Sequence, residues 1–312
     1  SAARSSKPHT VAPPDPIPVT VIGGYLGSGK TTLLNHLLRN GFRQRIAALV
    51  NDFGSIGIDG DLIADADGQT ITLTNGCICC SVGSDLMRAL WTVRDRPDPP
   101  EHVVIEASGI ADPGPVAHHA LTPGFDLDGV VVVLDAETVR RRERDPIIGR
   151  TIRRQLAAAD VLVLNKTDLV APADLEGLDA WLAERAPKVP VLHAVNADVP
   201  IAALLGSGHH ESAATEPHDH ADDYVSVSAT FDQPLRREVL EAVLAGLPPA
   251  VLRVKGIIRL AESPQLRTVV HRVASRTSIV TGQPWRPGEP GRLVLIALAG
   301  TEGLDAQVDK LR

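Results

Sequence analysis

Short runs of aliphatic and β-branched residues alternate with amphipathic stretches from about residue 17 to residue 205. Uniformly apolar runs are typical of parallel strands buried on both faces, and the stretches between them have the periodicity of covering helices. The pattern predicts strands at Val19–Ile22, Ile46–Val50, Ile71–Leu73, Val103–Ile105, Val130–Leu134, Val161–Leu164 and Val189–His193. It predicts helices at Thr31–Arg39, Ser84–Val93, Thr151–Ala159 and Asp174–Glu184. We therefore expect an α/β domain over residues 17–205, with a doubly wound and mainly parallel sheet.

The pattern changes after residue 205. Residues 206–223, GSGHHESAATEPHDHADD, have no apolar periodicity and predict an exposed, His-rich linker. The residues that follow predict a smaller α+β C-terminal domain over 224–312, with strands at Tyr224–Thr230, Leu252–Leu260, Arg267–Val273 and Leu293–Leu298 and helices at Leu235–Leu247 and Glu302–Leu311. Residues 1–16 are rich in Pro, Ser and Ala, and we expect a disordered tail there.

Charge and hydropathy narrow the function classes. The formal net charge is −7, so the chain has no general basic field to attract nucleic acid, and we expect no nucleic-acid partner. The sequence has no apolar run of the roughly 20 residues that span a bilayer, and its first residues lack the apolar stretch of a secretion signal. We therefore expect a cytoplasmic protein with no membrane partner.

The segment Gly23 to Thr32, GGYLGSGKTT, matches G-x-x-x-x-G-K-[ST] and lies between a predicted strand and a predicted helix. In such a P-loop, glycines let the backbone turn its N–H groups around the phosphates of a nucleotide. We expect Lys30 to reach the β- and γ-phosphates and Thr31 to ligate Mg²⁺. The predicted nucleotide-binding residues of this P-loop NTPase segment are Gly24, Gly27, Ser28, Gly29, Lys30, Thr31 and Thr32. A glycine-rich strand-to-helix turn is the alternative.

The tetrapeptide Asn165-Lys166-Thr167-Asp168 follows a predicted strand. In N-K-x-D elements the acid accepts hydrogen bonds from the N1–H and 2-amino groups of guanine, which adenine does not offer in that geometry. We therefore assign Asn165, Lys166 and Asp168 to base recognition, and the expected nucleotides are GTP and GDP rather than ATP.

Two acids that follow predicted strands are candidates for Mg²⁺. Glu106 begins EASG after the strand HVVI, where a Walker B acid is expected, and the Gly109 N–H is expected to approach the γ-phosphate. Asp52, within NDFG, takes the place of a first switch loop and is expected to contact Mg²⁺ directly or through water. With Lys30, these acids are the predicted catalytic residues, although a turn is the alternative for both segments.

The chain has three cysteines, and all lie within NGCICC: Cys77, Cys79 and Cys80. A clustered, odd set in a cytoplasmic protein argues against a disulfide framework. Thiolates are soft ligands that favour Zn²⁺ and also bind Co²⁺, Ni²⁺ or Fe²⁺, so the three sulfurs predict a metal site completed by a ligand from elsewhere. Small buried residues and a redox pair are the alternatives.

Histidines supply further candidate ligands. His209, His210, His218 and His220 lie among acidic residues in the predicted linker, where metal capture and simple solvation are both open. His118 and His119 follow the Glu106 loop and are candidates to complete the thiolate site, but histidines of a helix surface or core are the more ordinary interpretation.

As an ordered set, GGYLGSGKTTLLNHLL, NDFGSIGIDG, NGCICC, IEASGIADP and NKTDL resemble the CobW family of metal-handling P-loop GTPases. This family is related to the nickel-insertion GTPases of urease and hydrogenase, and RVKGIIRL and GRLVLIAL extend the resemblance, more weakly, to the C-terminal unit. The resemblance implies a metallochaperone or metal insertase that binds Zn²⁺ or Co²⁺ at the cysteines and uses GTP hydrolysis to control delivery. The family's first switch commonly reads NEFGE, whereas Asp52 and Ser55 stand at its acidic places here, which puts a role for position 55 in doubt.

The expected mechanism is that γ-phosphate and Mg²⁺ order the switch loops and so change the presentation of the thiolates. The recipient is expected to be a client metalloprotein or an enzyme of a metal-cofactor pathway, cobalamin biosynthesis included. Two other classes stay open at this point: a GTP-regulated protein-binding switch with a structural zinc, and a P-loop kinase or ATPase acting on a small molecule, for which NKTD would be accidental.

Overall fold

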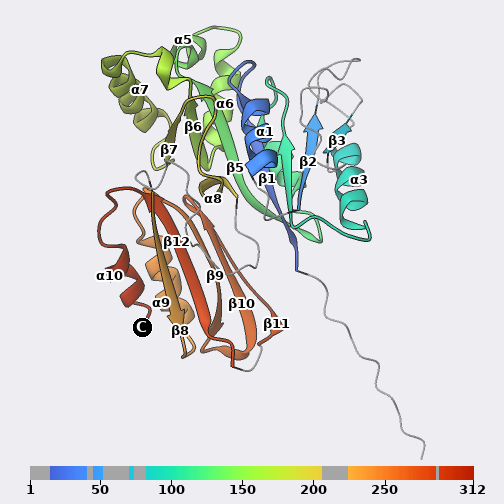
Figure 1. Cartoon of the computed structure of the whole chain (residues 1–312), viewed down its shortest axis with the longest axis vertical. Coiled ribbons are helices and arrows are strands. Elements are labelled where there is room, and N and C mark those ends of the chain that lie inside the picture. Colours follow the sequence, from blue (N-terminus) through green and yellow to red (C-terminus); the bar gives the residue numbers. More distant parts are fainter. Residues whose placement is uncertain (1–14, 41–44, 52–69, 74–81, 206–223, 286–287) are drawn as a thin grey trace, which may run out of the picture.

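The computed structural model describes residues 15–40, 45–51, 70–73, 82–205, 224–285 and 288–312. They form two β-sheets that follow one another along the chain (Figure 1). Residues 1–14, Asp52, the three cysteines and the predicted linker at 206–223 lie outside the described residues. Asp15, which the sequence analysis places in the tail, accepts a hydrogen bond from the Gln283 amide at 3.1 Å.

The first sheet has seven parallel strands in the order β3-β2-β4-β1-β5-β6-β7. Its strands are β1 (Ile17–Gly23), β2 (Ile46–Asn51), β3 (Thr70–Leu73), β4 (His102–Glu106), β5 (Phe125–Asp135), β6 (Val161–Asn165) and β7 (Val191–Ala194). The helices of this part are α1 (Lys30–Asn40), α3 (Val82–Arg94), α4 (Pro113–His119), α5 (Val139–Glu143), α6 (Gly149–Ala158), α7 (Pro172–Arg185) and α8 (Ile201–Leu204), with a 3-10 turn at Thr167–Leu169.

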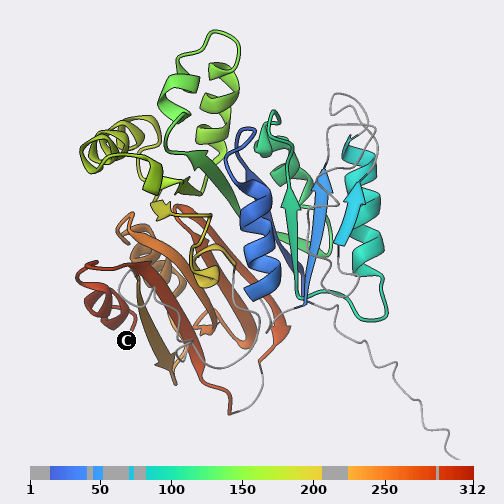
Figure 2. The same cartoon turned by 45° about the horizontal axis from the view of Figure 1, so that its top comes forward.

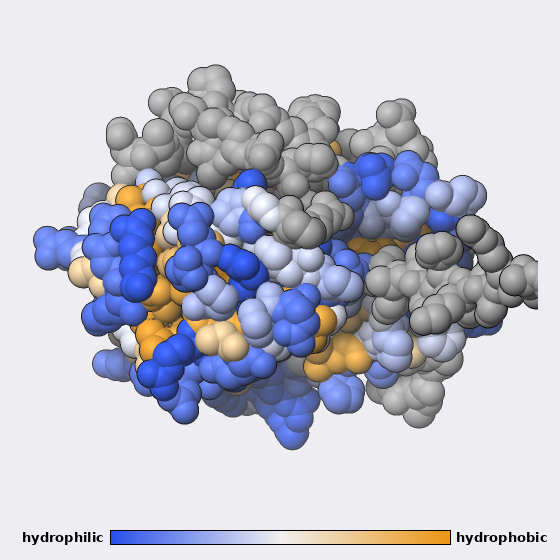
Figure 3. All heavy atoms as spheres, turned by 90° about the horizontal axis from the view of Figure 1, so that it is seen from below, coloured by the Kyte–Doolittle hydropathy of each residue, from blue (hydrophilic) through white to orange (hydrophobic). Residues whose placement is uncertain are grey.

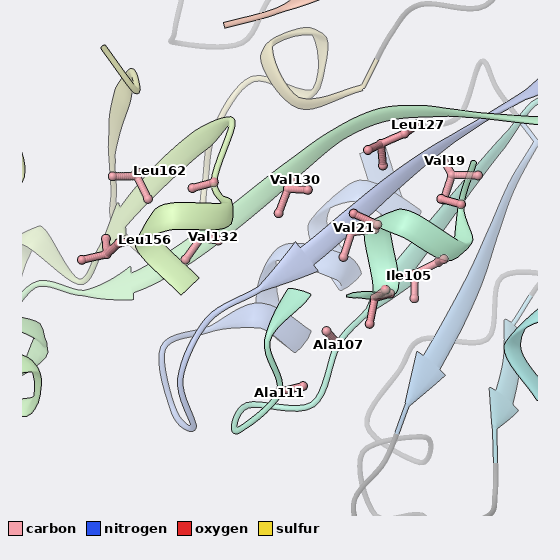
Figure 4. Packing of buried hydrophobic residues seen from close by; sticks show 14 of the residues in the cluster. Val19, Val21, Ile105, Ala107, Ala111, Leu127, Val130, Val132, Leu156 and Leu162 are labelled. Carbon is pink, nitrogen blue, oxygen red and sulfur yellow. The ribbon is translucent and has the colours of Figure 1, made fainter. Parts of the chain in front are cut away.

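The strands of this sheet are apolar on both faces, and helices cover each face. One face packs against α3, α4, α6 and α7, and Figure 4 shows Val21, Val130 and Leu156 among the side chains of that core. The other face is covered by α1 and α8, and Figure 2 shows α1 lying along the strands. This is the doubly wound α/β architecture that the sequence predicts, and it brings the carboxyl ends of the strands to one edge.

The second sheet is antiparallel, with five strands in the order β11-β10-β9-β12-β8. Its elements are β8 (Tyr224–Phe231), α9 (Arg237–Ala245), β9 (Val251–Leu260), β10 (Ser263–Val273), β11 (Arg276–Pro284), β12 (Gly291–Leu298) and α10 (Leu304–Asp309). Helices α9 and α10 bury their apolar sides against this sheet. The molecular face in Figure 3 is mostly polar, with smaller apolar patches between the polar residues. Within the described residues, no helix is both long and apolar enough to span a bilayer.

The predicted fold class is confirmed in both parts, and one strand and three α-helices of the structure are missing from the prediction. Strand β11 is missing from the prediction because RTSIVTGQP is largely polar and contains Gly and Pro. It lies at the edge of its sheet, where such residues are tolerated. Helices α4, α5 and α8 are also missing, since seven, five and four residues are too few to show a helical period.

A buried ion pair joins the two sheets. A β-bulge in β5 separates the partners of Val19 and Thr20 and leaves Asp128 as the extra residue of the strand. The Asp128 carboxylate accepts hydrogen bonds from the Arg253 guanidinium at 2.9 and 2.6 Å, and His271 Nε2 lies 2.9 Å from its other oxygen. Leu252 and Val273 of the second sheet extend the hydrophobic core formed over α1.

Burial of this cluster shifts two pKa values. Burial alone would raise the pKa of Asp128, but the Arg253 charge and the His271 hydrogen bond outweigh it and hold this pKa well below 3.8. Burial lowers the pKa of His102 from 6.5 to about 3, against the attraction of Asp128. His102 is therefore neutral, and because the Thr20 hydroxyl donates to Asp128 at 3.2 Å, His102 Nε2–H donates to Thr20 at 2.9 Å.

Candidate nucleotide-binding site

The P-loop follows β1 directly and ends where α1 begins. Gly24 has φ +134°, and a Cβ there would lie 2.3 Å from the Val133 carbonyl oxygen. Gly29 has φ +107°, and a Cβ there would lie 2.4 Å from the Asn165 amide nitrogen. Side chains other than hydrogen do not fit at either position, so the glycines of the motif are required by backbone conformation and by close packing. The Ser28 N–H donates to the Tyr25 carbonyl at 3.1 Å and closes the turn.

Lys30, Thr31 and Glu106 meet at the amino end of α1. Lys30 begins the helix with a buried side chain, and the next residue, Thr31, donates its hydroxyl hydrogen to Glu106 Oε1 at 3.0 Å. Glu106 is the last residue of β4 and is 4% exposed. A hydroxyl and a carboxylate side by side are the hard oxygen ligands that Mg²⁺ prefers, so these residues fit the ion that accompanies the triphosphate. The structure thus brings together the predicted Walker A and Walker B residues.

The loop after Glu106 lies against the P-loop. A Cβ at Gly109 would lie 2.8 Å from the Leu26 backbone nitrogen, so a side chain at position 109 would push the two loops apart. The Gln155 amide of α6 is fully buried and donates to the carbonyls of Gly109 and Ala111 at 3.2 and 3.0 Å. Sequence reasoning missed Gln155, because one amide in an amphipathic helix carries no motif.

Asn165 at the end of β6 connects the base-recognition element to the P-loop. Its amide nitrogen donates to the Ser28 carbonyl at 2.9 Å, and its oxygen accepts the Ala197 N–H at 2.7 Å. With an exposed fraction of 2%, its side chain is part of the scaffold. Asn165 therefore fixes the phosphate loop relative to β6 and to the turn after it that carries Lys166 and Asp168, and its role in base recognition stays a prediction.

Lys166 and Asp168 are held by the local backbone. Lys166 has φ +64°, an unusual conformation for a residue with a side chain, and its ammonium group pairs with Asp135 Oδ2 at 2.8 Å. Asp135, at the end of β5, also accepts the N–H groups of Glu137 and Thr138 at 3.0 and 3.2 Å, which fixes its carboxylate. Asp168 is exposed at the 3-10 turn and is thus accessible to a base. The sequence pattern did not identify Asp135, which belongs to no motif.

Other predicted residues lie apart from this arrangement. Thr32 is exposed on the first turn of α1. His118 and His119 end α4, with ring centroids 6.4 Å apart, and both occupy the partly exposed surface of that helix. Asp52, Cys77, Cys79 and Cys80 are outside the described residues, so their predicted roles stay predictions; within the described part of the chain, no group of three or more metal-ligating side chains occurs.

A parallel α/β sheet, a P-loop before its central helix, and an N-K-x-D element beside that loop define a P-loop GTPase. The chain belongs to the CobW/HypB/UreG family: the model of this family's nucleotide-binding domain matches residues 18–193. The model of the cobalamin synthesis protein CobW C-terminal domain matches residues 224–311. Family membership, which the ordered motifs predict, is confirmed.

Three curated relatives show how far the similarity extends. The zinc chaperone CobW of Sinorhizobium sp. is 34% identical over 90% of this chain and 93% of its own length. The zinc chaperone YjiA of Escherichia coli K12 is 32% identical over 88% and 92%. The zinc-regulated GTPase metalloprotein activator 1 of Schizosaccharomyces pombe is 38% identical over 50% of this chain and 40% of its own length. The first two similarities cover both sheets of the structure.

Proposed function

We propose that this GTPase is a metallochaperone: it binds Zn²⁺ through Cys77, Cys79 and Cys80 and uses the GTP cycle to hold the ion and release it to a client protein or cofactor pathway. The similarity to two zinc chaperones over about nine tenths of the chain carries this proposal. Thiolates bind Zn²⁺ strongly, and Co²⁺ is the other ion that such a ligand set suits.

The strand register supports a connection between the thiolates and the nucleotide. Strand β3 ends at Leu73, α3 begins at Val82, and the cysteines lie in the sequence between them. Leu73 pairs with Asn51 at the end of β2, and β2 in turn pairs with β4 so that Val50 lies beside Glu106. Leu73, the last described residue before the cysteines, therefore lies at the edge of the sheet that carries Glu106, two strands away from it.

In this mechanism the P-loop holds GTP with Lys30, and Thr31 and Glu106 would hold Mg²⁺, which would supply positive charge against the charge that develops on the phosphates. Asp52 belongs to the first switch loop and contributes to the same ion. Hydrolysis removes the γ-phosphate, so the loops that contact it lose a partner and the metal-bearing segment changes its presentation. Asp168 selects guanine, so the cycle depends on GTP.

Metal analysis tests the zinc site directly. Purified protein is equilibrated with one equivalent of Zn²⁺, dialysed, and assayed for bound zinc per chain. We expect one tightly held zinc in the unmodified chain and its loss in a variant with all three cysteines replaced by alanine. The matched control replaces the four linker histidines by alanine and is expected to keep this zinc; the replaced residues are His209, His210, His218 and His220. Zinc retained by the cysteine variant would overturn the proposed site, and zinc that never passes to a chelator would favour a structural role.

A further inference from the structure

The first helix after β5 contacts the tip of the P-loop. Arg142, in α5, donates from Nη1 to the Leu26 carbonyl oxygen at 3.1 Å. Its guanidinium carbon lies 5.2 Å from the centroid of the Tyr25 ring, within the range of a cation–π interaction. One side chain therefore contacts two consecutive residues of the P-loop, although it is more than 100 positions away from them.

The carbonyl that Arg142 contacts controls the direction of an N–H group. A trans peptide bond is planar, so the Leu26 C=O and the Gly27 N–H point in opposite directions. Gly27 has φ +75°, and no atom lies within 4 Å of the place where its Cβ would stand, so no side chain packs on this side of the peptide unit. The hydrogen bond from Arg142 holds the Leu26 carbonyl toward α5.

The other side of the loop tip is fixed as well. Gly109 packs against the Leu26 backbone and side chain, and Gln155 of α6 holds the Gly109 carbonyl at 3.2 Å. Helices α5 and α6 therefore contact the two loops that border the phosphates, α5 through Arg142 and α6 through Gln155. The Leu26–Gly27 peptide lies between these contacts, and its carbonyl faces α5.

We propose that Arg142 is a positioning residue of the GTPase. It fixes the Leu26 carbonyl toward α5 and thereby turns the Gly27 N–H toward the inside of the loop, where a P-loop binds the β- and γ-phosphates. Without the guanidinium, the Leu26–Gly27 peptide loses this restraint and must be ordered when the nucleotide binds. We expect the affinities for GTP and for GDP to fall alike, because backbone N–H groups of the loop contact the β-phosphate, which both nucleotides carry.

Neighbouring arginines provide matched controls. Arg141 lies in the same short helix and carries the same charge, but it is exposed, and within the described residues it has no contact with the P-loop. The Arg141→Ala change therefore removes a cation near the nucleotide without removing the contact. The Arg142→Lys change keeps a charged donor that can reach a carbonyl and lie over an aromatic ring.

The test measures equilibrium binding of fluorescent GTP and GDP analogues, together with kcat and KM for GTP, with Mg²⁺ and without zinc. Arg142→Ala is expected to weaken GTP and GDP binding in parallel by about three- to tenfold, as for the loss of one charged hydrogen bond at a partly exposed site. Arg142→Lys recovers most of this loss, and Arg141→Ala changes each affinity by less than about twofold. Because no zinc is present, the outcome is independent of the metal site.

Two results would overturn the proposal. If Arg142→Ala has no larger effect than Arg141→Ala, the contact with Leu26 does not position the loop. If kcat instead falls by about 100-fold or more while GDP affinity is unchanged, Arg142 acts on the γ-phosphate itself in the manner of an arginine finger. The melting temperature of each variant, measured without nucleotide, shows that a loss of binding does not come from unfolding.

Discussion

Removing the carboxylate of Asp128 should lower the free energy of unfolding, because it breaks the ion pair that joins the two sheets. Asp128 is 1% exposed and Arg253 is 2% exposed, so Asp128→Ala leaves an arginine charge buried without its counterion. Breaking a buried ion pair in this way costs about 3–5 kcal/mol. The carboxylate also accepts a hydrogen bond from Thr20, which adds to the loss. The expected decrease in unfolding free energy is therefore about 4 kcal/mol, a large part of the stability of an ordinary domain.

Urea unfolding followed by tryptophan fluorescence measures this loss in both parts of the chain. Trp181 is buried beneath the first sheet, and Trp285 follows β11 of the second, so single-tryptophan versions report on each separately. The control is Arg276→Ala, which breaks an ion pair with Asp160 at 3.2 Å whose arginine is 42% exposed, and which should cost at most about 1 kcal/mol. Adding Arg253→Met to Asp128→Ala removes the unpaired cation and should recover stability. If Asp128→Ala costs no more than Arg276→Ala, or if the double variant is less stable than the single one, the buried ion pair does not stabilise the fold in this way.

Two further predictions concern pH and base selection. The pKa of His102 is about 3 in the folded chain and 6.5 in the unfolded chain. The folded chain therefore favours neutral His102. This contribution to stability is complete above pH 6.5 and is lost as the pH falls below that value. Between pH 7 and pH 5 the free energy of unfolding should fall by about 2 kcal/mol by linkage. His102→Gln keeps a donor for Thr20 but does not titrate. In urea unfolding, this variant should therefore show a flatter dependence of stability on pH over the same range. Asp168→Asn replaces an acceptor by a donor, so GTP affinity should fall by about 100-fold. XTP, which has an oxygen in place of the 2-amino group of GTP, should bind better. An unchanged preference for GTP in a competition assay would show that Asp168 does not recognise the base.

Much of the first sheet could be predicted because its strands are uniformly apolar. The expected strand Val103–Ile105 lies within β4, which is buried along its whole length. A strand buried on both faces appears in the sequence as a continuous apolar run, and this run made the prediction possible. Strand β5 is longer than its prediction because FDLDG, before Val130, contains two acids and a glycine. Asp128 in that segment faces Arg253 of a distant strand, and a partner more than 100 residues away leaves no local pattern.

The nucleotide site could be predicted as far as its chemistry depends on contiguous motifs. Thr31 and Glu106 were identified separately, and the fold brings them to 3.0 Å because β4 and β1 are neighbours in the sheet. Asp135, Arg142 and Gln155 were not identified, because each acts through contacts with distant parts of the chain that exist only after folding. Asp135 ends β5, which is the neighbour of the P-loop strand β1 in the sheet. In a parallel α/β fold, a polar residue at this place indicates a ligand-binding site.

The link between nucleotide and metal is the central claim, and zinc affinity in defined nucleotide states tests it most directly. The zinc dissociation constant is measured by competition with a chelator in the presence of Mg²⁺ and a non-hydrolysable GTP analogue, with Mg²⁺ and GDP, and without nucleotide. Lys30→Ala, which removes the lysine predicted to bind the phosphates, is the control in which nucleotides should have no effect. If nucleotide and metal are linked, zinc affinity differs by about 5-fold or more between the GTP-analogue and GDP states, and zinc changes the ratio of the analogue's affinity to that of GDP by the same factor. The same zinc affinity in all three states would contradict this link.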